Sequence, residues 1–273
     1  MAFNAMKKIV TILLLCLSVG LICRYIGFYY SNKWCVREST VTLAKSDNLD
    51  YGVPCDCDIL IDREGYSLGY DNVIRQARWV MYRLTREEVL SNEVKRTNIF
   101  NQDPLIVEWY STSLDYLCSG YDRGHLAPAA DMAWSKKAME ESFYMSNISP
   151  QKPEFNRGIW CDLETWVREV AKRETNIIVV TGPVVLQEDM TNTIGRNKVI
   201  VPTAFYKVIY DETPPEKMIG FVMANEGSRV SIKNYVFSVD DIEEITGLDF
   251  FNALEDEKED ILEKGCDFST WER

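Results

Sequence analysis

The longest regular hydrophobic pattern in this 273-residue chain covers residues 154–173. Its apolar side chains recur at spacings of three and four, which predicts one amphipathic helix, and they are Phe155, Ile159, Leu163, Trp166, Val167 and Val170. A helix of this length must cover its apolar face with a sheet or another helix. Residues 176–183, a short β-branched run, directly follow it and are typical of a buried strand.

Other segments show the alternation or apolar content of strands, and they are residues 78–84, 105–110, 143–148, 199–210 and 217–223. Thr85 with Glu88 resembles a helix start, and residues 239–245 read as a helix that Gly247 ends. Residues 135–141 predict a further short helix, and the stretch after Gly124 reads as a surface loop. Helices and strands do not alternate regularly, so we expect an α+β fold with a mixed sheet.

The two ends of the chain differ from its middle. Residues 1–37 carry five basic and no acidic residues, and residues 9–23 are apolar and uncharged. Extended to residue 30, this stretch is long enough to span a membrane, so a signal-anchor and a cleaved signal peptide are both open, and a mitochondrial presequence is a third reading. We therefore expect a targeting or membrane-anchor segment at 1–37, one central domain at 49–252 and an acidic tail at 253–273.

The formal net charge of −12 argues against a general polyanion binder but allows one basic groove. Residues 249–273 hold nine Asp and Glu against three Lys and Arg, which suits either a solvated helical end or a segment that shields a basic site. Outside the apolar N-terminal stretch, six cysteines remain, and they fit either disulfides or reduced thiols. The Cys55-Asp56-Cys57 spacing is too tight for ordinary zinc chelation.

The only histidine, His125, follows Asp122-Arg123-Gly124. This places a group that titrates near neutral pH beside a fixed cation and a permissive backbone position. Chemistry on a phosphate needs such a set, because a base must activate water and a positive group must balance the growing charge.

Asn156 and Glu164 are eight residues apart on the predicted long helix, so they point to roughly the same side. An Asn carbonyl oxygen with an acid nearby suits a hard divalent ion that keeps several waters. Taken alone, the pair reads more simply as a helix cap and a solvated acid.

With the histidine motif in register, the chain strongly resembles the DNA/RNA non-specific endonucleases, and most of all their mitochondrial endonuclease G branch. The resemblance covers residues 49–252 and includes Asn147 and the segments 119–131, 134–151, 155–164, 180–183, 194–197, 201–208 and 246–248. Residues 85–115 match the family poorly, and Cys161 within the helix departs from its pattern.

The resemblance implies a ββα-metal (His-Me finger) nuclease with a mainly antiparallel central sheet flanked by helices. It implies that His125 deprotonates a water, that Asn156 holds a single Mg²⁺ or Mn²⁺ ion, and that Glu164 orients the waters around that ion. It implies that Arg123 stabilises the charged transition state and that Asn147 places the base or the substrate. Arg96 corresponds less closely to a phosphate-contacting position.

The resemblance also implies DNA and RNA as substrates, a homodimer and a mitochondrial location at the inner membrane or in the intermembrane space. A secretory or extracellular location is the alternative, and residues 9–30 would contact a membrane if they are not cleaved. Two other functions stay open at this point: a catalytically silent nucleic-acid-binding relative, and a membrane-anchored interaction protein stapled by disulfides. The preference between DNA and RNA, the oligomeric state and any inhibitor do not follow from the sequence.

Overall fold

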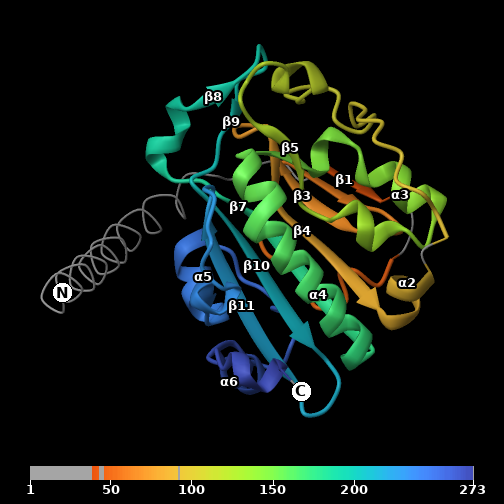
Figure 1. Ribbon diagram of the computed structural model, residues 1–273, viewed down its shortest axis with the longest axis vertical. Helices are drawn as coiled ribbons and strands as arrows, with labels where there is room; N and C mark the ends of the chain where they lie inside the picture. The colour runs from red at the N-terminus through yellow and green to blue at the C-terminus, as the bar shows by residue number, and fades with distance from the viewer. Residues whose placement is uncertain (1–38, 43–45, 92, 273) are drawn as a thin grey trace, which may run out of the picture.

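A computed structural model describes residues 39–42, 46–91 and 93–272. Its centre is an eight-stranded sheet, counted over these residues, in the order β1-β2-β3-β4-β7-β10-β11-β12 (Figure 1). The one parallel pair in this ladder is β1 with β2, and every other neighbouring pair is antiparallel. The prediction of an α+β fold with a mixed, mainly antiparallel sheet is confirmed.

The sheet strands are β1 (Ser39–Thr42), β2 (Ile59–Asp62), β3 (Ser67–Asp71), β4 (Gln76–Thr85), β7 (Asn176–Val184), β10 (Ala204–Asp211), β11 (Lys217–Ala224) and β12 (Val236–Phe237). Two short ribbons lie outside the sheet, formed by β5 (Asp122–His125) with β6 (Ile148–Gln151) and by β8 (Thr193–Ile194) with β9 (Val199–Ile200). The helices are α2 (Arg86–Ser91), α3 (Lys136–Ser142), α4 (Trp160–Glu174), α5 (Val239–Thr246) and α6 (Asp256–Glu263).

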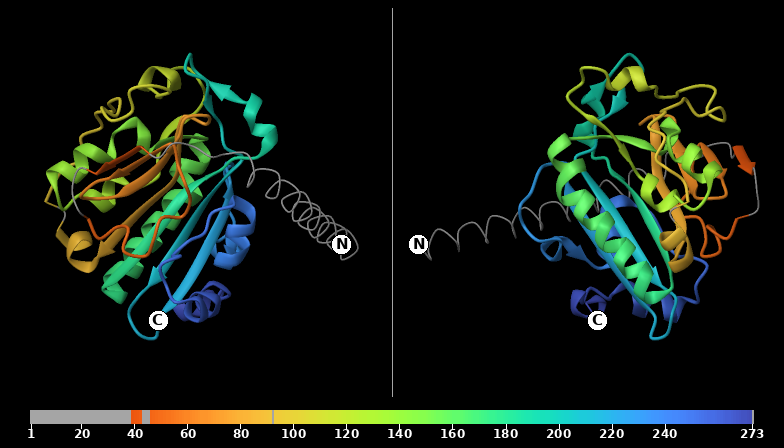
Figure 2. Two further views of the ribbon diagram at one scale, coloured as in Figure 1. Left: turned by 180° about the vertical axis from the view of Figure 1, so that it is seen from behind. Right: turned by 45° about the vertical axis from the view of Figure 1, so that its right-hand side comes forward.

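Strand alternation divides the core into two layers. On β4, Val80, Tyr82 and Leu84 pack with the apolar face of α4, whereas Trp79 and Met81 pack on the other side of the sheet. Figure 2 shows α4 lying along one face, with α5 on the other. Successive strand side chains point to opposite faces, so one strand supplies both layers.

The helix predicted at 154–173 forms, but its first turn is irregular. Residues Phe155–Ile159 make a π-helical turn in which Gly158 leaves helical backbone angles (φ −109°, ψ −117°). The regular helix α4 then runs from Trp160 to Glu174. A π turn widens the helix locally and recurs at functional sites.

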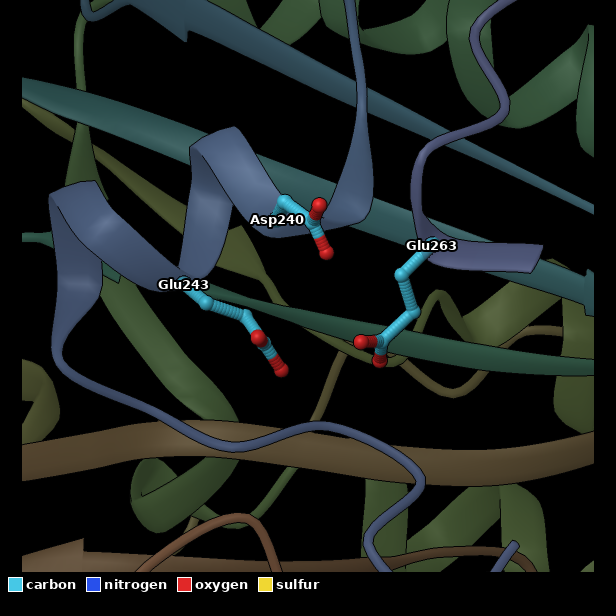
Figure 3. Close-up of side chains that lie close together, drawn as sticks. All are labelled: Asp240, Glu243 and Glu263. Atoms are coloured by element: carbon cyan, nitrogen blue, oxygen red, sulfur yellow. The ribbon is translucent and has the colours of Figure 1, made fainter. Parts of the chain in front are cut away.

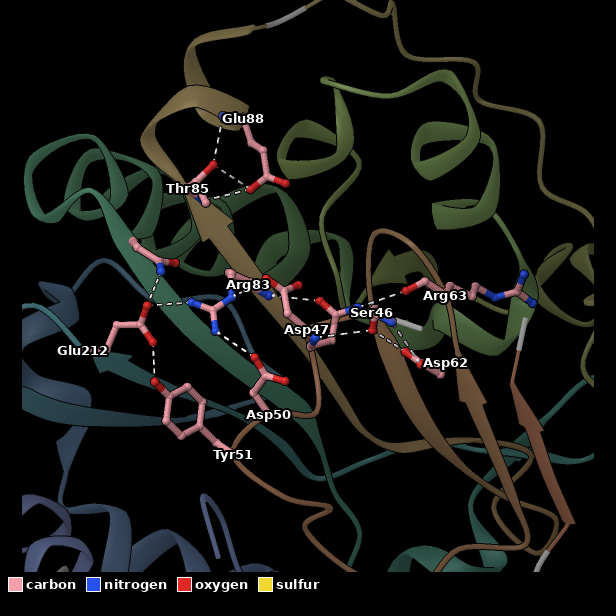
Figure 4. Close-up of polar contacts among 12 residues, drawn as sticks. Ser46, Asp47, Asp50, Tyr51, Asp62, Arg63, Arg83, Thr85, Glu88 and Glu212 are labelled. Carbon is pink, nitrogen blue, oxygen red and sulfur yellow. Dashed lines mark hydrogen bonds and ion pairs between the residues drawn. The ribbon is translucent and has the colours of Figure 1, made fainter. Parts of the chain in front are cut away.

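The entry segment is fixed to the sheet by charge. Arg83 of β4 lies 2.8 Å from Asp47 and 2.6 Å from Glu212, with Asp50 at 3.6 Å (Figure 4). Tyr51 also donates a hydrogen bond to Glu212. One guanidinium therefore joins the segment before β2 to the end of β10.

The C-terminal segment differs from the expected acidic tail. Trp271 is 1% exposed and packs against Trp166 of α4, and Lys217 of β11 lies over its ring. Helix α6 packs beside β11, near the marked C-terminus in Figure 1. Residues 253–272 are thus part of the fold, because their few apolar side chains reach the core.

Three local predictions were wrong. Residues 105–110 form no strand, and Trp109 has a positive φ of 56°. Residues 143–148 contain the 3₁₀ turn Met145–Asn147 instead of a continuous extended run. The stretch after Gly124 is not a surface loop, because Leu126 and Ala127 are fully buried. The predictions at 78–84, 135–141, 176–183, 217–223 and 239–245 are confirmed, and residues 199–210 divide into β9 and β10.

The predicted targeting segment at 1–37 lies outside the described residues. Within them, no helix has the length and apolar character needed to cross a membrane. Cys55, Cys57, Cys118, Cys161 and Cys266 are all free thiols.

Candidate active site

The two strands of the site are β5 and β6, which pair so that His125 lies opposite Ile148 and Gly124 opposite Ser149. A Cβ on Gly124 would lie 2.1 Å from the Gln151 side-chain oxygen, so any larger residue would force the buried Gln151 side chain to move. The glycine before the histidine therefore has a packing role, which is to leave room for Gln151. Helix α4 follows β6 through the π turn, which completes a ββα unit.

The His125 imidazole is 7% exposed and packs against two phenylalanine rings that also contact each other. Its ring centroid lies 4.8 Å from that of Phe143, nearly perpendicular, and 5.5 Å from that of Phe100. The two phenyl rings are themselves 5.0 Å apart. His125 Nε2 is buried and has no hydrogen-bond partner among the described residues. No described carboxylate bonds to this imidazole, and the two phenyl rings restrict its orientation.

Each phenylalanine carries an arginine on its face. The Arg123 guanidinium lies 4.3 Å from the centroid of Phe100, and that of Arg96 lies 5.1 Å from the centroid of Phe143. Arg123 donates a hydrogen bond to Ser113 Oγ at 2.6 Å, and Arg96 donates one to Asn98 at 2.7 Å. Both arginines are exposed, which leaves donors free for an anion.

Burial, together with the positive charges of Arg96 and Arg123, lowers the pKa of His125 to about 3. The fold therefore lowers the pKa of His125 well below the value of about 6.5 of a free histidine. The imidazole is neutral throughout the physiological range, because a charged ring would lie in an apolar pocket next to two cations. A neutral ring is the form that can accept a proton.

Asn147 lies behind the histidine and is fully buried. Its side chain accepts from the Ala127 amide and donates to the Ala127 and Ser142 carbonyls, each at 2.9 Å. Its backbone carbonyl also accepts from the Leu126 amide. Asn147 thus clamps the chain that leaves β5 just after His125. The geometry supports positioning of the base and gives Asn147 no direct access to substrate.

Phe100 and Phe143 were not singled out from the sequence. Phe143 falls inside the resembling segment, but Phe100 lies in the region that matches the family poorly. The structure brings Phe100 in through backbone bonds, since the Asn101 amide donates to the Phe143 carbonyl and the Met145 amide donates to the Asn101 carbonyl. Backbone hydrogen bonds between two segments so far apart in the sequence leave no periodic pattern in it.

Asn156 lies in the π turn, half-buried, and its amide nitrogen donates to Asp122 Oδ2 at 2.9 Å. Arg157 forms a bidentate ion pair with the same carboxylate, at 2.8 and 2.6 Å. These bonds lower the pKa of Asp122 despite its burial. They also fix the Asn156 amide, whose oxygen accepts no hydrogen bond from any described group. A fixed, unpaired amide oxygen fits a hard divalent ion.

Glu164 is on α4 and partly buried. Burial raises the pKa of Glu164. The positive charges of Lys207, which is buried on β10, and of Arg96 lower it. Lys207 is fully buried, with its ammonium 4.9 Å from the Trp160 ring centroid and no hydrogen-bond partner among the described residues. Beside this pair, Arg168 bridges to Asp131 at 2.9 Å. Glu164 therefore belongs to a buried charge network and is not the solvated helical acid of the simpler reading.

Comparison with known proteins identifies the family of this chain. A sequence profile of the DNA/RNA non-specific endonucleases matches residues 44–257. Human mitochondrial endonuclease G is 35% identical over 204 residues, which cover 70% of this chain and 69% of that protein. Mitochondrial nuclease EXOG of Danio rerio is 37% identical over 203 residues, which cover 69% of this chain and 59% of that protein.

The chain is also similar to a solved structure of the EndoG/EndoGI complex, which concerns the inhibition of EndoG. The TM-score is 0.71 and the sequence identity is 36%. The match covers 77% of this chain and 91% of the chain in that structure. The match therefore includes the fold as well as the sequence. The chain belongs to the DNA/RNA non-specific endonuclease family and is an enzyme of the nuclease class.

Proposed function

We propose that this chain is a metal-dependent, sugar-non-specific endonuclease that hydrolyses phosphodiester bonds of DNA and RNA, with His125 as general base. The observation that carries the proposal is the packing of a neutral imidazole against Phe100 and Phe143, each of which has an exposed arginine on its face. A proton acceptor next to two anion-binding groups suits attack of water on a phosphate.

The role of the base follows from its surroundings. His125 is neutral at pH 7, because burial and the charges of Arg96 and Arg123 lower its pKa to about 3. It accepts a proton from water when the negative phosphate approaches, because that charge offsets the effect of Arg96 and Arg123 on the imidazole pKa. Asn147 keeps the chain after His125 in place through its backbone contacts.

Asn156 would hold a single Mg²⁺ or Mn²⁺ ion through its amide oxygen, and Glu164 would orient waters around it. Such an ion stabilises charge on the phosphate and helps the leaving group. Arg123 binds the phosphate beside the base, and Arg96 contacts the neighbouring backbone. The identity of the metal as Mg²⁺ or Mn²⁺ rests on the oxygen donor and the lack of a cysteine or histidine set here.

The substrate range follows from what the site contacts. Its arginines and amide recognise phosphate, which DNA and RNA share, so we expect cleavage of double-stranded DNA, single-stranded DNA and RNA. Because the arginines would bind the phosphates through charge, binding should weaken as salt rises.

We infer a mitochondrial location, because the human and Danio rerio relatives are both named as mitochondrial. Residues 9–30 would then hold the enzyme at the inner membrane, or be removed to release it into the intermembrane space. A homodimer is part of the same proposal. Removal of residues 1–37 should leave a soluble, active enzyme, since every site residue lies beyond them.

A plasmid-nicking assay of the full chain with Mg²⁺, with Mn²⁺ and with excess EDTA tests this function. We expect nicking with either metal and none in EDTA, together with degradation of single-stranded RNA. Binding of DNA without any nicking would support the catalytically silent relative instead. Cutting that persists in EDTA would remove the metal from the proposal.

A further inference from the structure

A second group of ionisable side chains lies away from the active site, between α5 and α6. Asp240 and Glu243 are three residues apart on α5, and Glu263 is at the end of α6. One oxygen of each carboxylate lies within 4.8 Å of those of the other two, and Figure 3 shows the three groups converging on one point. Two short helices therefore present three acids to one another.

Glu263 is the member that a solvated acidic surface does not explain. It is 5% exposed, and its Oε1 is buried with no hydrogen-bond partner in the described part of the chain. None of the described ion pairs involves Asp240, Glu243 or Glu263. A buried carboxylate without a partner is costly, and neighbouring negative charges increase that cost.

The surroundings add more negative charge. Glu259, one helical turn before Glu263 on α6, also has a buried oxygen without a partner. Burial and these neighbouring carboxylates raise the pKa of Glu263 to about 9 and that of Glu243 to about 7. A cation bound among these carboxylates would balance their negative charge.

Glu243 already uses one oxygen to accept the Phe250 amide at 2.6 Å, which anchors the loop between the helices. The backbones of α5 and α6, together with this hydrogen bond, therefore hold the carboxylates in place. Oxygen donors of this type suit a hard cation, and Ca²⁺ takes carboxylates at about 2.4 Å in flexible geometry. Two ligands on opposite sides of Ca²⁺ are then about 4.8 Å apart, and the three carboxylate oxygens lie within that distance of one another.

We propose that Asp240, Glu243 and Glu263 form a structural Ca²⁺ site that joins α6 to α5, distinct from the catalytic metal site. The two helices belong to the layer behind the sheet, because Val239 and Ile242 of α5 pack in the core opposite α4. The site would hold the acidic C-terminal segment against the fold and would leave the catalytic groups unchanged.

The test is thermal unfolding of the full chain in detergent, in EDTA and in Ca²⁺ at increasing concentration, with Ca²⁺ binding measured by calorimetry. All variants carry Asn156→Ala, which removes the proposed ligand of the catalytic metal. We expect Ca²⁺ to raise the Tm of this background. Adding Glu263→Gln should weaken Ca²⁺ affinity by at least about tenfold, since a charged ligand is lost, and should raise the Tm in EDTA.

Glu244→Gln is the matched control, because Glu244 is exposed on the same helix and outside the cluster. It should keep the full response to Ca²⁺. An equal Tm shift with and without Glu263→Gln would overturn the proposal, and so would a background protein that does not respond to millimolar Ca²⁺. Mg²⁺ as effective as Ca²⁺ at equal concentration would overturn the choice of Ca²⁺.

Discussion

The active site and the α5–α6 cluster both bury ionisable groups, but the surrounding charges have opposite signs. His125 packs against two phenylalanines that each have an arginine on one face, and its pKa falls to about 3. Glu263 lies among other carboxylates, and its pKa rises to about 9. Burial disfavours the charged form in both places, and the neighbours reinforce that effect in both.

The comparison shows that burial of an ionisable group has different consequences in the two regions. At the active site it produces a neutral base surrounded by cations, so the site attracts a phosphate without protonating the base. At the cluster it produces an excess of negative charge that a cation or protons must balance. The sign of the neighbouring charge thus determines which ligand each region can take.

The largest effect should come from His125→Ala. We expect nicking activity to fall by about 10²–10⁴-fold or more, the scale for loss of a general base. The far-ultraviolet circular dichroism spectrum should be unchanged, because no described group hydrogen-bonds to the Nε2 atom that is lost. Near-wild-type activity with the spectrum intact would exclude His125 as the base.

The next effect separates Asn156 from Glu164. Asn156→Ala should lose nearly all activity, because its amide oxygen is the proposed direct ligand. Glu164→Gln should lose less and recover in part as metal is raised, since Glu164 acts through waters. Asp162→Asn is the control, because Asp162 is exposed on the same helix. Metal affinity that is unchanged in Asn156→Ala, measured by calorimetry in the His125→Ala background, would place the ion elsewhere.

Arg96 and Arg123 should contribute unequally. We expect Arg123→Ala to reduce kcat/KM more than Arg96→Ala, because Arg123 is two residues from His125 in the same strand. Each change should weaken binding by a similar factor for all DNA sequences. It should also reduce the slope of the logarithm of the binding constant against the logarithm of salt concentration by about one, as the loss of a phosphate contact does. Lys95→Ala is the matched control for Arg96, since Lys95 is an exposed neighbour. If the salt dependence of DNA binding is unchanged in Arg96→Ala, Arg96 does not contact the substrate.

Much of the fold and part of the site were predictable from the sequence. The long helix, β7 and β11 have periodic or β-branched patterns that their burial requires. The grouping of Arg123 and His125 is local in sequence. The family resemblance identified Asn147, Asn156 and Glu164, and the structure shows what each contacts.

The parts that were missed depend on contacts between distant residues. Phe100 reaches the imidazole through two backbone bonds of Asn101, which no periodicity reveals. Lys207 lies in a strand that reads as apolar, yet it is fully buried beside Trp160. The packing of Trp271 under α4 was hidden because most of its neighbours in sequence are charged or polar. The burial of Glu263 requires the pairing of α5 with α6, which the sequence does not show.

The smallest effect, and the most direct test of the comparison, is the pH dependence of stability in EDTA. The folded pKa of His125, about 3, is below its unfolded value of about 6.5. The unfolded chain therefore binds a proton between these values that the folded chain does not. Stability should fall as pH decreases from about 6.5, by at most about 1.4 kcal/mol per pH unit from this group. His125→Asn should flatten that decline.

Glu263 and Glu243 should act in the opposite direction. Their folded pKa values, about 9 and about 7, exceed the unfolded value of about 4.3, so the folded chain keeps protons that the unfolded chain has lost. Their contribution should be complete below about pH 4 and lost as pH rises through 7 to 9. Urea unfolding between pH 4.5 and 9 should show a smaller alkaline decline in Glu263→Gln and no change in Glu244→Gln. Saturating Ca²⁺ should suppress the same decline in the wild type, because the bound ion replaces the protons. If His125→Asn and Glu263→Gln change the same side of the pH profile, then neighbouring charge does not set the two pKa shifts in opposite directions.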